Sequence, residues 1–448
     1  MTDLRAALAD VHDGCLADLE ALARIPSISS EPEHEGDVRA AIDRVAELAR
    51  AAGAASLDVV AAGGHPALIA HWPAPAGRPT VLLYAHADVQ PTGPLEEWTS
   101  PPFEPTRRDG RLYGRGAADD KAGVMLHLAV LRAFGGTPPV GVVLFIEGEE
   151  EIGSPTLTRL LAEHRDALRS DVIVIADSAN AAVDVPAFTT SLRGLVDVYV
   201  EIRLLERPVH SGMFGGPAGD ALTVLCRLLA TLHDEDGGVA IEGLHVGSSS
   251  APDIDEAVYR ADTTLIPAAQ LLGCGSIVDR LWDKPAVSVL GIDAPSTAQA
   301  SNVLLPRARA KVSLRIAPGD DASSAMKALT RHLESRVEWG AEISVTEGSA
   351  GDPFALETTG AVYDLARQAF GEAYGNTAVE TGIGGSIPFI AEFARTYPGA
   401  TVLVTGVGDP ASRWHGIDES LDLSMWQKAC LAEALLLQGL AATDGQRG

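Results

Sequence analysis

The feature that most constrains the fold is a short apolar segment that ends abruptly in polar residues. Residues 81–85 read Val-Leu-Leu-Tyr-Ala, an unbroken apolar run typical of a strand buried on both faces of a parallel sheet. His86 and Asp88 follow, and residues two apart on a strand project to the same side. Because ligands gather beyond the carboxyl ends of strands in open α/β sheets, this pair predicts a functional edge.

Three further apolar segments also lead into polar residues. In addition, Asp119 and Asp120 precede a helix that is predicted to begin near Lys121. These segments are 142–146, 172–176 and 401–405. The polar side chains expected at this edge of the sheet are His86, Asp88, Asp119, Glu150, Glu151, Asp177 and His415. Two imidazoles and several carboxylates suit zinc, manganese or cobalt better than calcium. Taken alone, residues 149–151 are equally compatible with a solvated acidic loop.

The length and patterning of the chain predict two domains. A chain of 448 residues exceeds what one hydrophobic core usually serves. From about residue 191 the pattern changes to strand, helix, strand, helix, strand, which predicts an inserted α+β, ferredoxin-like domain over 190–351. The first domain is then discontinuous, 1–189 and 352–448, with a mixed, largely parallel sheet flanked by helices. Residues 91–110 are expected to form a loop without regular structure, and residues 236–290 are expected to be loop-rich.

Composition excludes some classes of partner. Lys plus Arg number 34 against 61 Asp plus Glu, a net charge of −27, which argues against a nucleic-acid or anionic-membrane partner. No apolar run approaches the roughly 20 residues of a membrane span. The four cysteines lack CxxC spacing and the N-terminal segment lacks the pattern of a signal peptide, so we expect a cytoplasmic protein.

Eight short motifs lie in order between about residues 80 and 420. They are HADVQP, GRGAADDKAG, EGEEEIGS, the strand-ending Asp177, VHSGMFGG, KVSLRIAP, GGSIP and HGIDES. Together they resemble the dinuclear metallopeptidase family of aminoacylase, carboxypeptidase G and carnosine dipeptidase, and the dipeptidase branch most of all. The resemblance implies a zinc-peptidase type of catalytic domain whose inserted domain serves as a lid and dimerisation surface.

The resemblance also implies a role for each metal-site residue. One metal ion is expected on His86 and Asp177. A second is expected on Glu151 and His415, and Asp119 bridges the two. The implied cofactors are two divalent ions per subunit, Zn²⁺ first and Mn²⁺ or Co²⁺ as alternatives.

Two further acidic residues of this site have implied catalytic roles. Asp88 is expected to orient His86 from behind. Glu150 is expected to act as the general base for an attacking water whose pKa the cations lower.

The inserted domain is expected to grip the substrate. In the family, the histidine that matches His210 reaches the active site of the partner subunit and stabilises the oxyanion, which implies a homodimer. Arg315 can hold a substrate carboxylate with two hydrogen bonds. Asn302 and Ser386 match family positions that contact substrate. Near these motifs, Pro208-Val209 departs from the family pattern, which leaves the preferred substrate open.

The sequence therefore predicts a metallopeptidase that hydrolyses a dipeptide or similar small amide with a free carboxylate. The alternative is an N-acyl-amino-acid deacylase or a carbamoyl-amino-acid hydrolase that uses the same attack by water. A non-catalytic binding protein is disfavoured, because it would have no use for a base such as Glu150 beside the five expected ligands.

Overall fold

The computed structural model describes residues 3–249, 251–384 and 388–442. The chain divides into two compact units. Unit 1 comprises Met1–Thr190, Glu357–Thr381 and Ile387–Gly448, and unit 2 comprises Ser191–Leu356 with a short segment that begins at Gly382. Within the described residues, no helix combines the length and apolar character needed to span a membrane.

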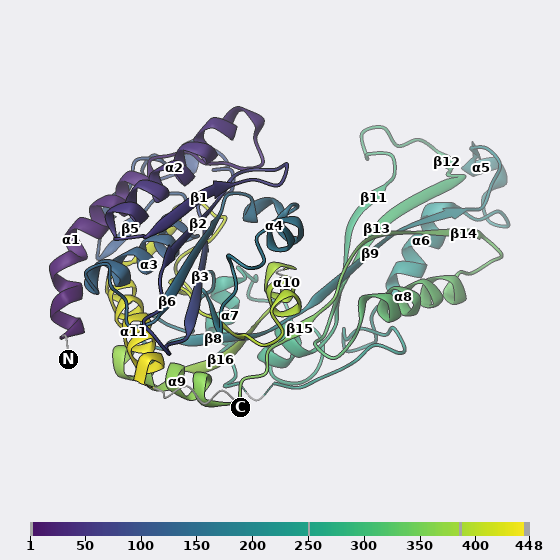
Figure 1. Cartoon of the computed structure of the whole chain (residues 1–448). Coiled ribbons are helices and arrows are strands. Elements are labelled where there is room, and N and C mark those ends of the chain that lie inside the picture. The colour runs from purple at the N-terminus through teal and green to yellow at the C-terminus, as the bar shows by residue number, and fades with distance from the viewer. Residues whose placement is uncertain (1–2, 250, 385–387, 443–448) are drawn as a thin grey trace. The chain divides into compact units, whose positions relative to one another are not determined.

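Unit 1 is built on a six-stranded sheet in the order β1-β2-β6-β3-β7-β17. Figure 1 labels β1, β2, β3 and β6 of this sheet. Its strands are β1 (Ser56–Val60), β2 (Ala67–Trp72), β3 (Thr80–His86), β6 (Gly141–Glu147), β7 (Val172–Ile175) and β17 (Thr401–Val404). β3 runs parallel to β6 and β7, and β17 runs parallel to β7. β2 is antiparallel to both β1 and β6. The expected mixed, largely parallel sheet is thereby confirmed.

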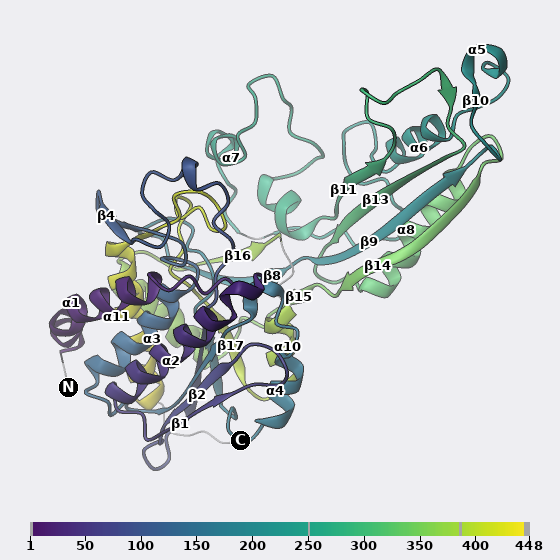
Figure 2. The same ribbon diagram turned by 90° about the horizontal axis from the view of Figure 1, so that it is seen from above.

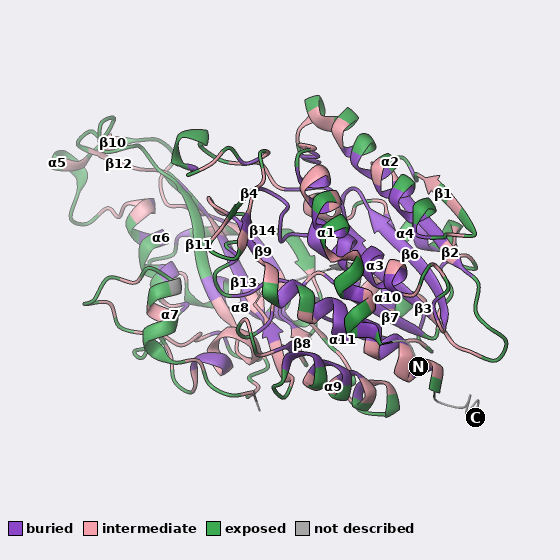
Figure 3. Cartoon of the chain, turned by 90° about the vertical axis from the view of Figure 1, so that its left-hand side faces the viewer, coloured by how far each residue is buried: buried purple, intermediate pink, exposed green. Residues whose placement is uncertain are grey.

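Helices cover both faces of this sheet, so its central strands are buried, as Figure 3 shows. One face packs on a core that includes residues of α1 (Leu4–Ala23), α2 (Glu35–Ala51), α3 (Lys121–Ala133), α9 (Ala361–Tyr374) and α11 (Leu423–Ala442). The opposite face meets α10 (Pro388–Thr396), which packs against α4 (Leu157–Glu163). There, the rings of Tyr84 and Phe145 contact Phe393 at centroid distances of 5.4 and 6.1 Å. Alternate side chains of the buried strands thus pack into two apolar layers, one on each face of the sheet.

A second, three-stranded sheet corrects the expectation for residues 91–110. Its strands are β4 (Thr106–Arg108), β5 (Arg111–Tyr113) and β18 (Ser420–Asp422). β4 pairs with β5 across a tight turn at Asp109 and Gly110, both of which have positive φ. Strands of three residues are too short for apolar alternation to reveal them. Three more short strands, β8 (Ala187–Leu192), β15 (Phe354–Ala355) and β16 (Val379–Ile383), lie where the chain passes from one unit to the other.

Unit 2 contains a four-stranded antiparallel sheet in the order β11-β13-β9-β14, visible in Figure 2. Its strands are β9 (Gly194–Arg203), β11 (Ala286–Asp293), β13 (Arg307–Ile316) and β14 (Glu342–Gly351). Helices α6 (Ala221–Ala230) and α8 (Ala322–Arg336) share a core with the sheet. This β-α-β-β-α-β order is that of a ferredoxin-like domain.

Residues 236–290 contain more regular structure than the sequence predicts. They include α7 (Glu256–Asp262), a π-helix at Asp279–Asp283 and the start of β11. β11 lies at the edge of the sheet, and its residues from Ser288 onward are exposed, so it lacks the alternation of a half-buried strand. Short elements complete this unit: β10 (Val209–His210), α5 (Ser211–Phe214) and β12 (Val303–Leu304).

Candidate metal centre

The loops that follow neighbouring strands of unit 1 converge on one cluster of acidic and imidazole groups. His86 ends β3, Asp177 follows β7, and the short helix at Glu150–Ile152 follows β6. Ligand atoms of His86, Glu150 and Asp177 lie within 4.8 Å of one another. The same holds for His86, Asp119 and Glu151. These two groups share His86, so the five side chains form one continuous cluster.

Asp119 lies between the two imidazoles of the cluster. Its Oδ1 is 3.2 Å from Nε2 of His86, and its Oδ2 is 3.0 Å from Nε2 of His415. The same nitrogen of His415 is 3.2 Å from Oε2 of Glu151. One carboxylate therefore presents a separate oxygen to each histidine, which is the arrangement that a ligand bridging two ions requires.

The electrostatics of this cluster fit bound cations. Without one, burial, followed by the charge of Asp177, raises the pKa of Glu150 to about 9. Burial also raises the pKa of Asp177 to about 7. Hydrogen bonds with Asp119 and Glu151 raise the pKa of His415 to about 10. Because buried carboxylates ionise together only when positive charge compensates them, a donor set of carboxylates and imidazoles suits divalent metal ions.

Asp88 braces the cluster from behind. It is fully buried, and its Oδ1 lies 3.4 Å from Nδ1 of His86. Its two carboxylate oxygens also accept hydrogen bonds from the backbone N–H groups of Glu150 and Glu151, at 3.2 and 3.0 Å. Asp88 thus holds the ring of His86 through its backbone oxygen, 3.0 Å from Nδ1, and holds the loop after β6 through its side chain.

Two glutamates and a glutamine that hold this site were not singled out from the sequence. Gln90 donates through Nε2 to Oε2 of Glu151 at 2.8 Å and to its backbone oxygen at 3.0 Å. Glu149 is buried and accepts from the backbone N–H groups of His65 and Thr156, so it ties two loops together and lies in neither ligand group. The signal for Gln90 was its place in the HADVQP motif.

Glu419 fixes the loop that carries Asp119. It is fully buried, and its oxygens accept from Nη1 of Arg115 at 2.7 Å and from the backbone N–H groups of Gly116, Ala118 and Asp119 at 3.1, 2.9 and 3.1 Å. Four donors on one carboxylate offset its desolvation. Glu419 belongs to the HGIDES motif, but nothing in its residue type distinguishes a buried acceptor from a surface glutamate.

The remaining predicted residues belong to unit 2 or lie outside the described residues. His210 is exposed, and its Nδ1 accepts from the backbone N–H of Gly212 at 3.1 Å. The backbone oxygen of Asn302 accepts from Ser211 N–H at 2.9 Å, which places Asn302 beside the His210 turn. Arg315 is half-buried on β13. Ser386 lies outside the described residues.

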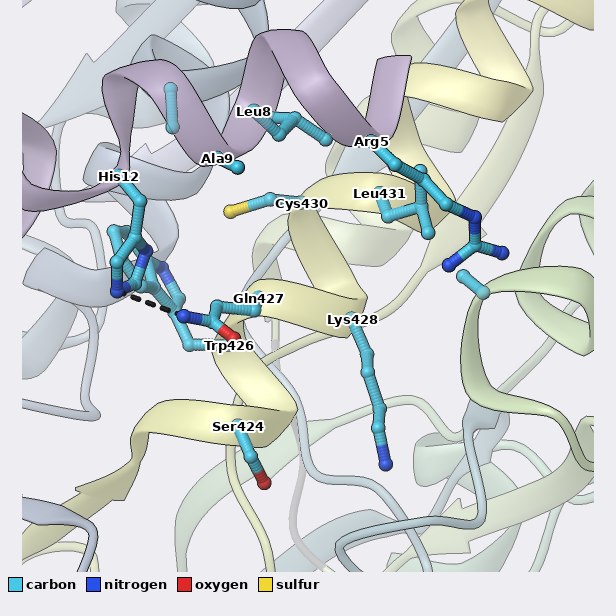
Figure 4. A pocket seen from close by; sticks show the side chains of 12 residues that line it. Arg5, Leu8, Ala9, His12, Ser424, Trp426, Gln427, Lys428, Cys430 and Leu431 are labelled. Atoms are coloured by element: carbon cyan, nitrogen blue, oxygen red, sulfur yellow. Dashed lines mark hydrogen bonds between the residues drawn. The ribbon is translucent and has the colours of Figure 1, made fainter. Parts of the chain in front are cut away.

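A separate cavity of about 430 Å³ between α1 and α11 lies apart from this chemistry (Figure 4). Its lining residues are Arg5, Leu8, Ala9, His12, Ala129, Ala373, Ser424, Trp426, Gln427, Lys428, Cys430 and Leu431. His12 and Gln427 form a hydrogen bond there at 2.9 Å. None of these residues belongs to either group of candidate ligands, so the cavity is separate from the candidate metal centre.

Comparison with known proteins gives concordant results. A model of the peptidase family M20/M25/M40 matches residues 82–438. The cysteinylglycine-S-conjugate dipeptidase of Corynebacterium striatum is 36% identical over 367 residues, covering 80% of each chain. The Beta-Ala-His dipeptidase of Homo sapiens is 28% identical, covering 76% of this chain and 70% of that relative. The crystal structure of human carnosine dipeptidase 1 matches with a TM-score of 0.79 at 25% identity, covering 98% of each chain.

Proposed function

The chain belongs to peptidase family M20/M25/M40, and on this premise we propose that it hydrolyses dipeptides with a free carboxylate in a dinuclear metal centre. Relatives that are named dipeptidases support the substrate class. The observation that carries the proposal is Asp119, whose two oxygens face His86 and His415 separately. The four cysteines are free thiols, which supports a cytoplasmic location.

The residues of unit 1 fit two metal ions. We assign His86 and Asp177 to one ion and Glu151 and His415 to the other, with Asp119 shared. Bound divalent cations would polarise the scissile carbonyl and lower the pKa of the attacking water. Zn²⁺ is the first expectation for this ligand set, with Mn²⁺ and Co²⁺ as alternatives.

Glu150 is the proposed general base. A base must be deprotonated before the reaction, yet burial, followed by the charge of Asp177, raises the pKa of Glu150 to about 9. Positive charge in the centre is therefore required for Glu150 to accept a proton at neutral pH. Asp88 sets the position of this base, because it holds the backbone N–H of Glu150 at 3.2 Å.

Unit 2 supplies the proposed contacts to substrate. Arg315 would bind the free carboxylate, and His210 and Asn302 would contact the peptide. We propose a homodimer in which His210 serves the active site of the partner subunit. Its exposed side chain is available for such a contact.

The dimer is tested by mixing two inactive variants, His210→Ala and Glu150→Gln. If His210 acts in trans, each mixed dimer contains one intact composite site, and activity returns once subunits exchange. The control is each variant incubated alone. Absence of activity after demonstrated subunit exchange would rule out the cross-subunit role.

The substrate class is tested with a panel of compounds on protein reconstituted with Zn²⁺, Mn²⁺ or Co²⁺. The panel contains Cys-Gly, β-Ala-His, N-acetyl amino acids and N-carbamoyl amino acids. Turnover of the dipeptides, abolished by a chelator and restored by metal, is the expected result. Preference for the N-acyl or N-carbamoyl compounds would establish the alternative function. Hydrolysis that survives complete metal removal would contradict the proposed centre.

A further inference from the structure

Residues 405–409 of unit 1 contact two loops that carry candidate metal ligands. They follow β17, which is the parallel neighbour of β7. Asp177 lies in the loop after β7, and His415 lies in the loop before β18. Because these two ligands are assigned to different ions, the segment that connects their loops influences the separation of the two ions.

The first contact joins residues 405–409 to the loop after β7. The backbone N–H of Gly408 donates to the oxygen of Ser178 at 3.2 Å, and the N–H of Asn180 donates to the oxygen of Gly408 at 2.8 Å. Nδ2 of Asn180 also donates to the backbone oxygen of Gly406 at 2.9 Å. A methyl group at Gly406 would overlap the backbone of Ser178. Backbone therefore packs directly on backbone, and hydrogen bonds join the two loops.

The second contact is made by Trp414, the residue before His415. A methyl group at Gly408 would overlap Cζ2 of Trp414 and would lie 2.6 Å from its Cε2 and 2.9 Å from its Cη2. The three atoms nearest to such a methyl group all belong to this ring, so the indole lies directly against the glycine. Gly408 does not have a positive φ, so its backbone conformation does not require glycine. The close approach of the indole does.

His415 depends on such a contact because its own surroundings constrain it little. Its side chain is 57% exposed. Its φ of 58° lies in the left-handed region, which residues other than glycine rarely adopt and which persists only where neighbouring contacts maintain it. The adjacent indole, half-buried against the core of unit 1, supplies a contact of this kind.

Trp414 acts through the surface of its ring and not through its N–H group. Nε1 is buried and has no hydrogen-bond partner within the described part of the chain. A buried donor without a partner costs free energy, so packing of the ring is what stabilises this residue in its place.

We propose that Trp414 is a positioning residue that holds His415 and Asp177 in a fixed relation. It does so by packing on Gly408, whose loop is hydrogen-bonded to the loop of Asp177. The inference rests on the proposed function and extends it, because one indole supports ligands of both ions.

The test is the affinity for Co²⁺, measured by competition with a chelator, together with the absorption spectrum of the bound ion, which reports its coordination geometry. Trp414→Ala should lower the affinity by about 10-fold or more, the range for groups that orient metal ligands, and should change the spectrum. Trp414→Phe keeps an aromatic ring and removes the unpartnered donor, so it should retain most of the affinity. The control is Trp339→Ala, at an exposed tryptophan of unit 2, which should bind Co²⁺ as wild type does.

Substitution of the two glycines gives a sharper criterion. Gly408→Ala should displace the indole and lower the affinity as Trp414→Ala does. The double variant should bind Co²⁺ no more weakly than Trp414→Ala alone, because removal of the ring makes room for the methyl group. Gly406→Ala is the matched control, because its methyl group meets the backbone of Ser178, and Trp414→Ala should not rescue it.

Three results would overturn the proposal. The first is additive losses for Gly408→Ala and Trp414→Ala, which would show that the two residues act independently. The second is rescue of Gly406→Ala as well as Gly408→Ala. The third is a loss in Trp414→Phe as large as that in Trp414→Ala, which would assign the effect to the N–H group.

Failure of the proposed function can be separated from failure of this inference, because metal affinity is measured without turnover. Affinity that depends on Trp414, in a protein that hydrolyses no dipeptide, would refute the function and retain the inference. Dipeptide hydrolysis by wild type, together with an affinity and a spectrum that Trp414→Ala leaves unchanged, would retain the function and refute the inference. A wild type that binds no divalent ion would refute both.

Discussion

The metal centre of unit 1 and strand β13 of unit 2 carry opposite excesses of charge. In the centre, Asp119, Glu150, Glu151 and Asp177 crowd together around His86. In unit 2, β13 carries three arginines and a lysine but no acidic residue. The net charge of the whole chain predicts neither site. The comparison teaches that the sign of a local charge excess indicates which ligand to test: cations at the candidate metal centre and, as proposed above, a substrate carboxylate at Arg315.

The two sites also differ in how they are held. The centre is assembled from loops, and side chains such as Asp88, Gln90 and Glu419 brace those loops through hydrogen bonds. Arg315 is positioned by the register of two neighbouring strands, since it pairs with Leu195 of β9. A site braced by side chains loses its geometry when one brace is removed, whereas a site set by register does not. The following predictions test this difference, beginning with the largest expected effect.

Two adjacent glutamates in the centre should respond differently to the same substitution. Glu150→Gln should lower kcat by at least about 10²–10⁴-fold, since an amide cannot accept the proton of water, and should retain its metal. Glu151→Gln should lose metal, because an amide oxygen is a poorer ligand than a carboxylate. Elemental analysis beside kcat for each variant measures both effects.

Glu149→Gln is the matched control for this pair, because Glu149 braces loops and lies in neither ligand group. It should keep its metal. If Glu150→Gln loses metal while Glu151→Gln retains it, the two roles are reversed. Metal and activity retained in both variants would make the segment a solvated acidic loop.

Removal of the positive charge in unit 2 should affect substrate recognition and leave the metal in place. Arg315→Ala should lower kcat/KM for a dipeptide by about 10–100-fold, the range of a charge-assisted hydrogen bond. Amidation of the substrate's C-terminus should therefore lower kcat/KM far more in the wild type than in the variant. Equal losses on amidation in both proteins would show that Arg315 has another role.

Loss of one brace should weaken the centre without removing a ligand. Gln90→Met keeps the size of the side chain but removes the donor to Oε2 of Glu151, so metal affinity should fall by about 10-fold or more. Competition with a chelator measures it. Gln427→Met, in the cavity between α1 and α11, is the matched control. Equal affinities in the two variants would show that Gln90 does not hold the ligand.

Glu147 should make the stability of the folded protein depend on pH. It ends β6, accepts a hydrogen bond from the hydroxyl of Tyr84 at 2.8 Å, and burial raises its pKa from 4.5 to about 8. The folded state therefore favours the protonated acid, so stabilisation is full below pH 4.5 and is lost as the pH rises through about 8.

Glu147→Gln imitates the protonated acid. Compared with wild type, the metal-loaded variant should be equally stable at pH 4.5 and more stable at pH 9, by about 1–3 kcal/mol in the free energy of unfolding. Denaturant unfolding at both pH values measures this. A variant that is less stable at pH 9 would show that the carboxylate is needed in its charged form.

Sequence reasoning predicted the parts of the molecule in which residue type follows directly from burial, namely the buried strands and the polar residues after them. Apolar runs predicted β3, β6, β7 and β17, and the residues that follow them formed the cluster that the motifs indicated. The edge strand β11 was not predicted, because most of its residues are exposed and it therefore lacks alternating apolar and polar residues.

Gln90 and Glu419, which brace the candidate metal centre, were not predicted for another reason. Gln90 and Glu419 act on groups 61 and 300 or more residues away in the chain, and several of their partners are backbone atoms, which are the same in every residue. The type of a residue does not indicate which backbone groups its side chain will bind in the folded protein.

The pairing of Glu419 with Arg115 has a consequence for biosynthesis. These residues are 304 positions apart, and His415 comes just before Glu419. A ribosome therefore completes β3, β6 and β7, with their loop acids, long before the second imidazole and the carboxylate that braces Asp119 leave the exit tunnel. Until then the crowded acids of the nascent chain must remain protonated, solvated or bound to transient ions. The proposed ligand set can thus be completed only after residue 415 has been synthesised, and a chain that terminates before that residue lacks the second imidazole.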